Sequence, residues 1–343
     1  MRVVLHADDF GLNRAISAGI VRGFARGLLT STALLANAPH AAGALEAWKQ
    51  LASRRTECGL PSDALRKELD DDAPFDLGVH LNLTQGRPLT GPKYPAELLD
   101  GQGLFPGIFR LFHRLQRRAD IFRVGLRDEL VAQITFLLDH GLRPTHLNGH
   151  QYVELVPPVA EVVRELLERY RIHSVRVAVE PALFSTTLLH DRRPGAWLLA
   201  RVKQHFARHF RSCLAAGSVA YPQIFFGTAH AGRIDAGLME RFLIRSPGVD
   251  LIEIGLHPSE ATADSAACGN PDGWFDPLAK LRPNELALLE SAALPRLLKA
   301  RHLTLGRLSQ LSAAYESTAP FASARTLFGH EPTSRPRQPS IQV

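Results

Sequence analysis

Residues 2–27 read RVVLHADDFGLNRAISAGIVRGFARG, and this stretch decides the fold. Val3–His6 is a short apolar run of the kind that forms a buried strand, and the loop that follows it carries two aspartates. Asn13 is a suitable N-cap for a helix, and Gly27 lies where that helix is expected to end. The apolar residues of this helix recur at helical spacing: Ile16, Ile20, Phe24 and Leu28. The stretch therefore predicts a strand, a loop with two carboxylates and a helix.

The alternation of strand-like and helical segments continues through most of the chain. Seven segments are strand-like: Val3–His6, Ser31–Leu35, Phe75–Leu83, Thr145–Asn148, Ser174–Val179, Gln223–Phe226 and Leu251–Leu256. Between them lie helical patterns such as Arg127–His140, which Gly141 ends, and Val159–Tyr170, which two prolines open. Alternating strands and helices are typical of parallel sheets. We therefore predict an α/β fold, an irregular TIM-like (β/α) barrel that is closed or nearly closed, with about seven parallel strands.

Length and composition favour a single large domain. The chain has 343 residues, of which 45% are hydrophobic and 22% charged, an ordinary globular composition. We expect residues 1–315 to form the barrel domain, with basic helical insertions and with Arg282–Leu311 as its last helical segment. Residues 316–343 are rich in Ser, Thr, Pro and Arg and poor in apolar side chains, which predicts a disordered C-terminal tail.

Several classes of protein are disfavoured. Arg2 follows Met1 at the start of a strand-like run, which leaves no room for a classical signal peptide. The sequence has no run of about 18 apolar residues, which a membrane-spanning helix would need. Cys58, Cys213 and Cys268 are far apart and form no CxxC pair, so neither a disulfide framework nor a thiolate zinc site is indicated. We expect a cytoplasmic protein.

The formal net charge of +6 is concentrated in residues 106–125 and 186–216, which together carry eleven arginine and lysine residues against two aspartates. Apolar residues are interleaved with these cations: Ile108, Leu111, Leu115 and Ile121 in the first stretch, and Trp197, Leu198, Val202, Phe206 and Phe210 in the second. This pattern predicts amphipathic helices that contact an anionic membrane peripherally, at its inner face. The alternative is that these helices pack on the barrel or at a subunit contact. We do not expect a nucleic-acid partner.

Polar residues lie in or just beyond the ends of four of the predicted strands, where barrel enzymes gather their catalytic residues. Asp8 and Asp9 follow the first strand, His80 lies in the third, His150 closes the fourth and His257 closes the last. Two adjacent carboxylates after a buried strand are costly unless a cation neutralises them, and a divalent metal ion is the simplest partner. One carboxylate would then bind the ion while the other takes a proton from water. Taken alone, an Asp-Asp pair is more often an ordinary surface or capping pair.

Histidines could supply the rest of a metal site. His80 and Asn82 are two residues apart in a strand, so their side chains point to the same face. His146, Asn148 and His150 form the densest polar group, and one carboxylate with two imidazoles leaves a coordination position open. Each histidine, taken alone, could instead be a core residue that is bonded to a backbone carbonyl.

Further candidates lie around the later strands. His257, fixed by Pro258, could act as a general acid that protonates a leaving amine, or could be structural. Arg176 and Glu180 could bind substrate hydroxyl groups or pair with each other. We assign five residues as candidate substrate contacts: Asn82, His146, Asn148, Arg176 and Glu180.

Five segments, in order along the chain, carry a resemblance to a known family: HADDFGLN (6–13), GLLTSTALLANAP (27–39), LGVHLNLTQGRPL (77–89), PTHLNGHQYVELVP (144–157) and IEIGLHP (252–258). Together they resemble the YdjC-like carbohydrate deacetylase family, which includes chitooligosaccharide deacetylases and members associated with hopanoid biosynthesis. The similarity runs over roughly residues 1–315. Five motifs in the right order are far more specific than any one of them.

The resemblance implies a TIM-like barrel that removes an N-acetyl group from an amino sugar. Matched position by position, Asp8 resembles the general base and His257 the acid, while Asp9, His80 and His150 resemble the ligands of one divalent metal ion. Mixed nitrogen and oxygen ligands suit zinc best but tolerate several divalent ions, so zinc and magnesium both stay open. The resemblance also suggests a homodimer.

The chain departs from the family at three positions that are not metal ligands. Tyr152 and Glu154 stand where family members often carry histidine, and Asn148 stands where they often carry aspartate. These departures predict an altered substrate pocket, and the basic stretches favour a lipid-linked sugar as the substrate. Two alternatives stay open: a metal-dependent phosphoesterase, and a non-catalytic barrel that binds a glycan or a membrane surface.

Overall fold

The computed structural model describes residues 1–53, 75–181, 183–215, 219–246, 248–261 and 272–311. Their centre is a curled sheet of seven strands in the order β4-β3-β2-β1-β6-β5, with β7 paired to β1. The strands are β1 (Arg2–Phe10), β2 (Ser31–Leu34), β3 (Asp76–Leu81), β4 (Leu147–Gly149), β5 (Ile224–Phe226), β6 (Leu251–Leu256) and β7 (Thr304–Leu305). All the pairings between these strands are parallel. The predicted irregular TIM-like barrel is confirmed as a curled half-barrel.

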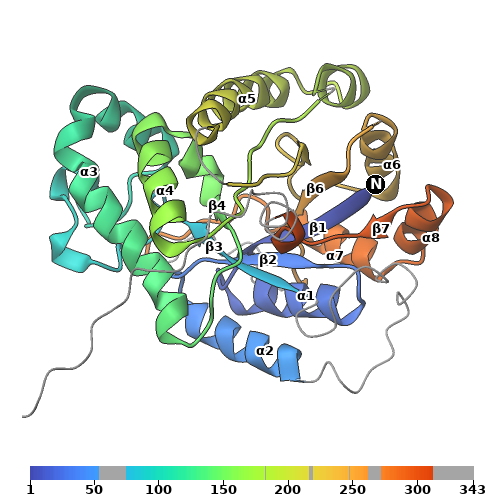
Figure 1. Cartoon of the computed structure of the whole chain (residues 1–343), viewed down its shortest axis with the longest axis horizontal. Coiled ribbons are helices and arrows are strands. Elements are labelled where there is room, and N and C mark those ends of the chain that lie inside the picture. The colour runs from blue at the N-terminus through green and yellow to red at the C-terminus, as the bar shows by residue number, and fades with distance from the viewer. Residues whose placement is uncertain (54–74, 182, 216–218, 247, 262–271, 312–343) are drawn as a thin grey trace, which may run out of the picture.

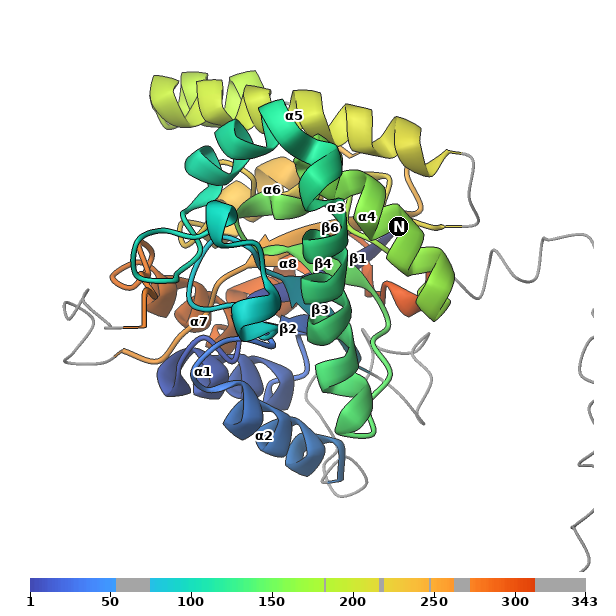
Figure 2. The same ribbon diagram turned by 90° about the vertical axis from the view of Figure 1, so that its left-hand side faces the viewer.

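Helices surround this sheet (Figure 1). They are α1 (Arg14–Ala25), α2 (Ala41–Ser53), α3 (Ile108–Asp139), α4 (Pro157–Tyr170), α5 (Pro194–Leu214), α6 (Ala236–Ile244), α7 (Arg282–Glu290) and α8 (Ala293–Ala300). Short helical turns are η3 (Gly91–Lys93), η4 (Ala96–Leu98), η5 (His150–Leu155) and the π-helix η6 (Phe184–His190). α1 and α2 lie below the sheet and α5 lies along the top, as Figures 1 and 2 both show.

β1 is the central strand of the sheet. Val3, Val4 and Leu5 have no exposed surface, as expected for a parallel strand that is covered on both faces. The strand is longer than predicted and continues through both aspartates to Phe10. Its pairing with β2 shifts register between Ala7 and Phe10. The predicted loop is therefore the irregular end of the strand.

The first helix confirms the prediction from its cap. Asn13 Oδ1 accepts a hydrogen bond from the backbone N–H of Ile16 at 2.8 Å. The helix ends at Ala25, and Gly27 follows with a φ of 73°, in the left-handed region that glycine adopts readily. Leu28, expected on the helix face, lies beyond the end of the helix and is buried.

The predicted strand Ser174–Val179 is wrong. This segment makes only two isolated bridges, from Val175 to Leu147 of β4 and from Ser174 to Ala220 ahead of β5. It fills the gap between the two edge strands, but β4 has only three residues, so no ladder of consecutive pairs forms.

The predicted final helical segment, Arg282–Leu311, is wrong in part. It contains two short helices, α7 and α8, followed by β7, which pairs with β1 through Arg2 and Thr304. The helical pattern breaks at Ser291, whose φ and ψ of −79° and 153° are extended. Residues 316–343 lie outside the described residues, so the proposed domain boundary stays a prediction.

The two basic stretches contain helices, as predicted. Arg127–His140 is the second half of one long helix, α3, which begins at Ile108. Leu111, Leu115 and Phe210 are fully buried in the core, so much of the apolar face expected to meet a membrane packs on the barrel instead. In the part of the chain that the structure describes, no helix combines the length and apolar character needed to cross a bilayer.

Gly19 on α1 provides a test of the helix packing. A Cβ added there would lie 2.7 Å from Cα and 2.9 Å from the carbonyl carbon of Ser259, in the loop after β6. Helix propensity alone predicts that Gly19→Ala raises the free energy of unfolding by up to about 1 kcal/mol. We expect instead that Gly19→Ala lowers the free energy of unfolding by about 1–3 kcal/mol, because the added Cβ would contact backbone that cannot move aside cheaply. Urea denaturation measures the difference.

Gly195→Ala on α5 is the matched control. A Cβ at Gly195 meets nothing within 4 Å, so this variant should be as stable as the wild type or slightly more stable. Stabilisation by both substitutions would contradict the described packing of α1.

Candidate metal centre and active site

The carboxyl ends of four strands bring together the residues singled out in the sequence. Asp8 and Asp9 lie near the end of β1, His80 lies in β3, His150 follows β4 and His257 follows β6. Neighbouring residues of a regular strand point to opposite faces. Asp9 departs from this alternation because its φ is 67°, a value that is uncommon for a residue other than glycine. This backbone conformation, at the register shift, lets both carboxylates contact histidines of the site.

Asp9, His80 and His150 form a compact buried triad. Asp9 Oδ1 lies 2.9 Å from His150 Nδ1 and 3.3 Å from His80 Nε2. One ligand atom from each of the three residues lies within 4.8 Å of the other two. His80 Nδ1 lies 2.8 Å from Asn148 Oδ1 and donates a hydrogen bond to it. Because Nδ1 then carries the proton, the lone pair of Nε2 is available to bind a metal ion.

The triad fits a divalent metal ion. Two imidazoles and one carboxylate are a ligand set that zinc and similar ions accept, with positions left for water and substrate. His150 Nε2 is buried and has no hydrogen-bond partner, so a nitrogen lone pair is also available on this ring. Burial alone would raise the pKa of Asp9, but Arg282 and His150 outweigh it and hold the pKa well below its usual range. Asp9 is therefore ionised, as a metal ligand must be.

Arg282 is a member of the site that the sequence did not reveal. Its Nη2 donates to Asp9 Oδ2 at 2.6 Å, and its Nε donates to Asp276 Oδ2 at 2.8 Å. Arg282 opens α7, 273 residues after Asp9, and no local pattern distinguishes it from the other arginines.

Asp8 lies in a dense network of its own. Arg176 Nη1 donates to Asp8 Oδ2 at 2.7 Å, and Asn148 Nδ2 donates to Asp8 Oδ1 at 2.9 Å. His6 Nε2 is 3.1 Å from the same Oδ1. Arg176 also pairs with Glu253, a buried carboxylate in an otherwise apolar strand. Burial opposes ionisation of Asp8, yet Arg176 and His80 hold its pKa well below its usual range.

His257 lies beside Asp8. Its Nε2 is 3.6 Å from Asp8 Oδ2, and its Nδ1 is buried without a hydrogen-bond partner. The backbone N–H of His257 donates to Glu285 Oε2, which fixes the start of the loop after β6. Burial lowers the pKa of His257 to about 4, so its imidazole is neutral near pH 7.

Three of the candidate substrate contacts are buried supports. Asn82 bonds within its own loop, where its Oδ1 accepts from the backbone N–H groups of Thr84 and Gln85. Asn148 bridges His80 and Asp8. His146 has no exposed surface, and its ring packs edge-on against that of His6 at 5.0 Å. None of the three presents a surface to a substrate.

The other two candidate contacts do not pair with each other. Arg176 binds Asp8 and Glu253, whereas Glu180 Oε2 accepts from the backbone N–H of Thr228 at 2.9 Å. Burial raises the pKa of Glu180 to about 7.

One further neighbour of the site lies far away in the sequence: the ring of Trp274 is 6.4 Å from that of His150.

The fold has been seen before. A solved structure from Enterococcus faecalis V583, assigned provisionally to cellobiose-phosphate cleavage, covers 93% of this chain and 99% of its own, with a TM-score of 0.65 and 19% identity. That likeness supports the irregular barrel.

Sequence relatives identify the family. A carbohydrate deacetylase of Vibrio cholerae serotype O1 is 26% identical over 320 residues, which cover 92% of this chain and 98% of the relative. The carbohydrate deacetylase of Homo sapiens is 33% identical over 192 residues, or 55% of this chain and 52% of the relative. The family model described as YdjC-like protein matches residues 2–300. The chain therefore belongs to the YdjC-like family.

Proposed function

We propose that this protein is a metal-dependent carbohydrate deacetylase that removes an N-acetyl group from an amino sugar. The observation that carries the proposal is the meeting of Asp9, His80 and His150 beside a second ionised carboxylate, Asp8, in a chain of this family. In this proposal Asp9, His80 and His150 hold one zinc or magnesium ion. Such an ion polarises the acetyl carbonyl group and lowers the pKa of a water molecule.

Asp8 is the general base in this mechanism. It is ionised before the reaction and accepts the proton that the attacking water loses. Arg176 and Asn148 hold its two oxygens in place, so the carboxylate does not have to reorient when the proton arrives.

His257 delivers a proton to the leaving amine. Because its imidazole is neutral near pH 7, it can do so only after it has received a proton during the reaction. Asp8 Oδ2, 3.6 Å away, is an adjacent source. We infer that the proton passes from water to Asp8 and then, through His257, to the sugar nitrogen.

Deacetylation is favoured over the alternatives. A two-metal phosphoesterase would need a second group of ligands, and among the described residues one triad meets the geometric requirement. A non-catalytic barrel would not need an ionised base beside the triad. Release of acetate from N-acetylglucosamine or its oligomers separates these functions.

Substitution of the base and of a ligand should have different consequences. Asp8→Asn should lower kcat by about 10²-fold or more and leave the metal content unchanged, because the amide cannot accept the proton. His150→Ala should lose both the metal and the activity. Acetate release and elemental analysis of the same samples measure the two properties. Loss of metal from Asp8→Asn would place that residue among the ligands instead.

Removal of the ion should affect stability as well as activity. A chelator should abolish acetate release and lower the melting temperature, since an ion that binds only the folded chain stabilises it. Readdition of zinc or magnesium, one at a time, should restore both properties and identify the ion. Full activity after exhaustive chelation would refute metal dependence.

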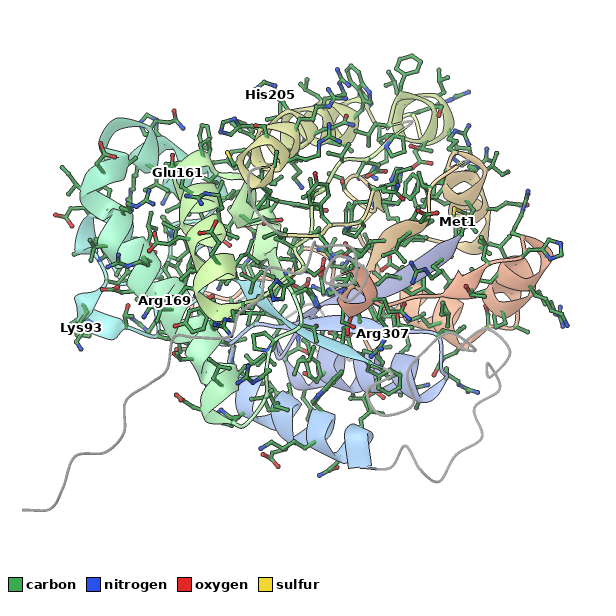
Figure 3. All side chains as sticks on the ribbon, viewed as in Figure 1. Met1, Lys93, Glu161, Arg169, His205 and Arg307 are labelled. Carbon is green, nitrogen blue, oxygen red and sulfur yellow. The ribbon has the colours of Figure 1, made fainter. Side chains whose placement is uncertain are left out.

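We propose further that the sugar is lipid-linked and is met at the cytoplasmic face of an anionic membrane. The support is the outer side of η6 and α5, where Leu189, Leu198 and Val202 are 64%, 60% and 47% exposed beside the exposed Arg192 and Arg201. α5 forms the top edge of the molecule in Figure 3. A homodimer through this surface would bring arginines together, so the predicted dimer would use another face.

Liposome flotation tests the membrane contact. The wild type should bind anionic vesicles at low salt and dissociate as the ionic strength rises. Leu198→Glu with Val202→Glu should abolish binding, whereas Ile244→Glu, at an equally exposed position on α6, should not. Wild-type protein that stays unbound at low salt would remove the proposal.

A further inference from the structure

One buried carboxyl group beside the site, that of Glu285 on α7, has no part in the chemistry proposed above. Glu285 has no exposed surface. Its Oε1 accepts a hydrogen bond from the backbone N–H of Ile234 at 3.0 Å, and its Oε2 accepts one from the backbone N–H of His257. Each oxygen thus has a main-chain donor, and the two donors belong to different loops.

The two loops follow neighbouring strands of the sheet. β5 and β6 pair in parallel, and the last pair of their ladder is Phe226 with Ile254. His257 directly follows β6, and Ile234 lies between β5 and α6. Glu285 therefore joins the two segments beyond the end of their ladder, on the side of the sheet where the site lies.

A carboxyl group at this position has a cost. Burial raises the pKa of Glu285 to about 7, although the N–H groups of Ile234 and His257 act in the opposite direction. An apolar side chain would avoid this cost, but it would leave both N–H groups without their acceptor. The position of the His257 backbone consequently depends on a side chain of α7 as well as on β6.

The same turn of α7 also holds a metal ligand. Arg282 lies three residues before Glu285, so the two side chains lie on the same side of the helix. Arg282 Nη2 donates to Asp9 Oδ2 at 2.6 Å. The imidazole of His257 has its Nε2 3.6 Å from Asp8 Oδ2. The first turn of α7 is therefore bonded both to the triad and to the candidate acid.

We infer that Glu285 is a positioning residue, which holds the backbone of His257 so that the imidazole can deliver its proton to the leaving amine. This inference rests on the proposed deacetylase function. When the C–N bond breaks, the nitrogen keeps the electron pair and takes the proton from His257, and acetate is released. A displacement of about 1 Å can cost about 10²-fold in rate, so a small movement of this backbone is enough.

The inference makes the effect of Glu285 depend on the leaving group. An amine needs a proton in order to leave, whereas 4-nitrophenolate is weakly basic and leaves without one. Both reactions need the same attack by water, which Asp8 and the triad assist. A displaced His257 should thus slow the amide and spare the ester, while general damage to the fold should slow both.

A comparison of N-acetylglucosamine with 4-nitrophenyl acetate tests this expectation. Glu285→Gln should lower kcat for acetate release from the sugar by about tenfold or more with little change in KM, because an amide has one acceptor oxygen where the carboxylate has two. Its kcat for the ester should stay within about twofold of the wild-type value. An equal loss on both substrates would overturn the inference, since that is the result of a merely structural role.

Glu290→Gln is the matched control on the same helix. Glu290 pairs with Arg22 at the surface and makes no contact with the loops after β5 and β6 among the hydrogen bonds and ion pairs of the described residues. Both rates should stay at their wild-type values in this variant.

A double substitution shows whether Glu285 acts through His257. His257→Ala alone should give the same pattern of amide and ester rates with a larger loss on the amide. The addition of Glu285→Gln should cause little further loss, because residues that act on one step are not additive. Losses that multiply in the double variant would contradict a role through His257.

Amide hydrogen exchange measures the contact apart from catalysis. In Glu285→Gln the amides of Ile234 and His257 should exchange about tenfold faster or more, whereas Ile254, inside the β5–β6 ladder, should keep its wild-type rate. Wild-type rates at all three amides would remove the proposed role. Faster exchange in a protein that releases no acetate would refute the deacetylase and leave Glu285 as the anchor of the loop.

Discussion

Two neighbouring carboxylates buried at the end of β1 are the constraint from which the site follows. Asp8 and Asp9 are 4% and 3% exposed, and the negative charges of two adjacent carboxylates oppose each other's ionisation. Each carboxylate has its own guanidinium group: Arg176 lies 2.7 Å from Asp8, and Arg282 lies 2.6 Å from Asp9. Without these cations, burial would favour two neutral acids, which could neither hold a metal ion nor accept a proton.

This pairing also explains where the barrel is irregular. Arg176 lies in the gap between β4 and β5, where its side chain reaches Asp8 and Glu253. Removing one partner of a buried ion pair leaves an uncompensated charge at a cost of about 3–5 kcal/mol. The ion pairs of Arg176 therefore hold this segment in place together with its two backbone bridges. Arg282 ties the start of α7 to β1 in the same way.

The sequence was sufficient for what depends on local pattern and spacing. Apolar runs gave six of the seven predicted strands, and the polar residues at their ends gave the triad with Asp8 and His257. Local pattern could not give Arg282, which joins the site through an ion pair across the fold, or β7, which is too short to have a pattern. The substrate contact predicted at Asn82 rested on its face of the strand alone, whereas its hydrogen bonds to the following turn depend on a loop geometry that no local pattern encodes.

The metal ligands and α5 are held in place by different interactions. The metal ligands stand on or directly after strands whose positions are set by backbone pairing, such as that of His80 with Asn148. α5 contributes none of them and is anchored by apolar packing, with Phe210 fully buried. It nevertheless brings Lys203 to Tyr152, and burial lowers the pKa of this lysine to about 8 and raises that of Glu154 to about 7. Tyr152 and Glu154 are also two of the three positions at which the sequence predicts a departure from the family, and both lie close to where α5 meets the barrel. The third, Asn148, contacts His80 and Asp8 beside the triad.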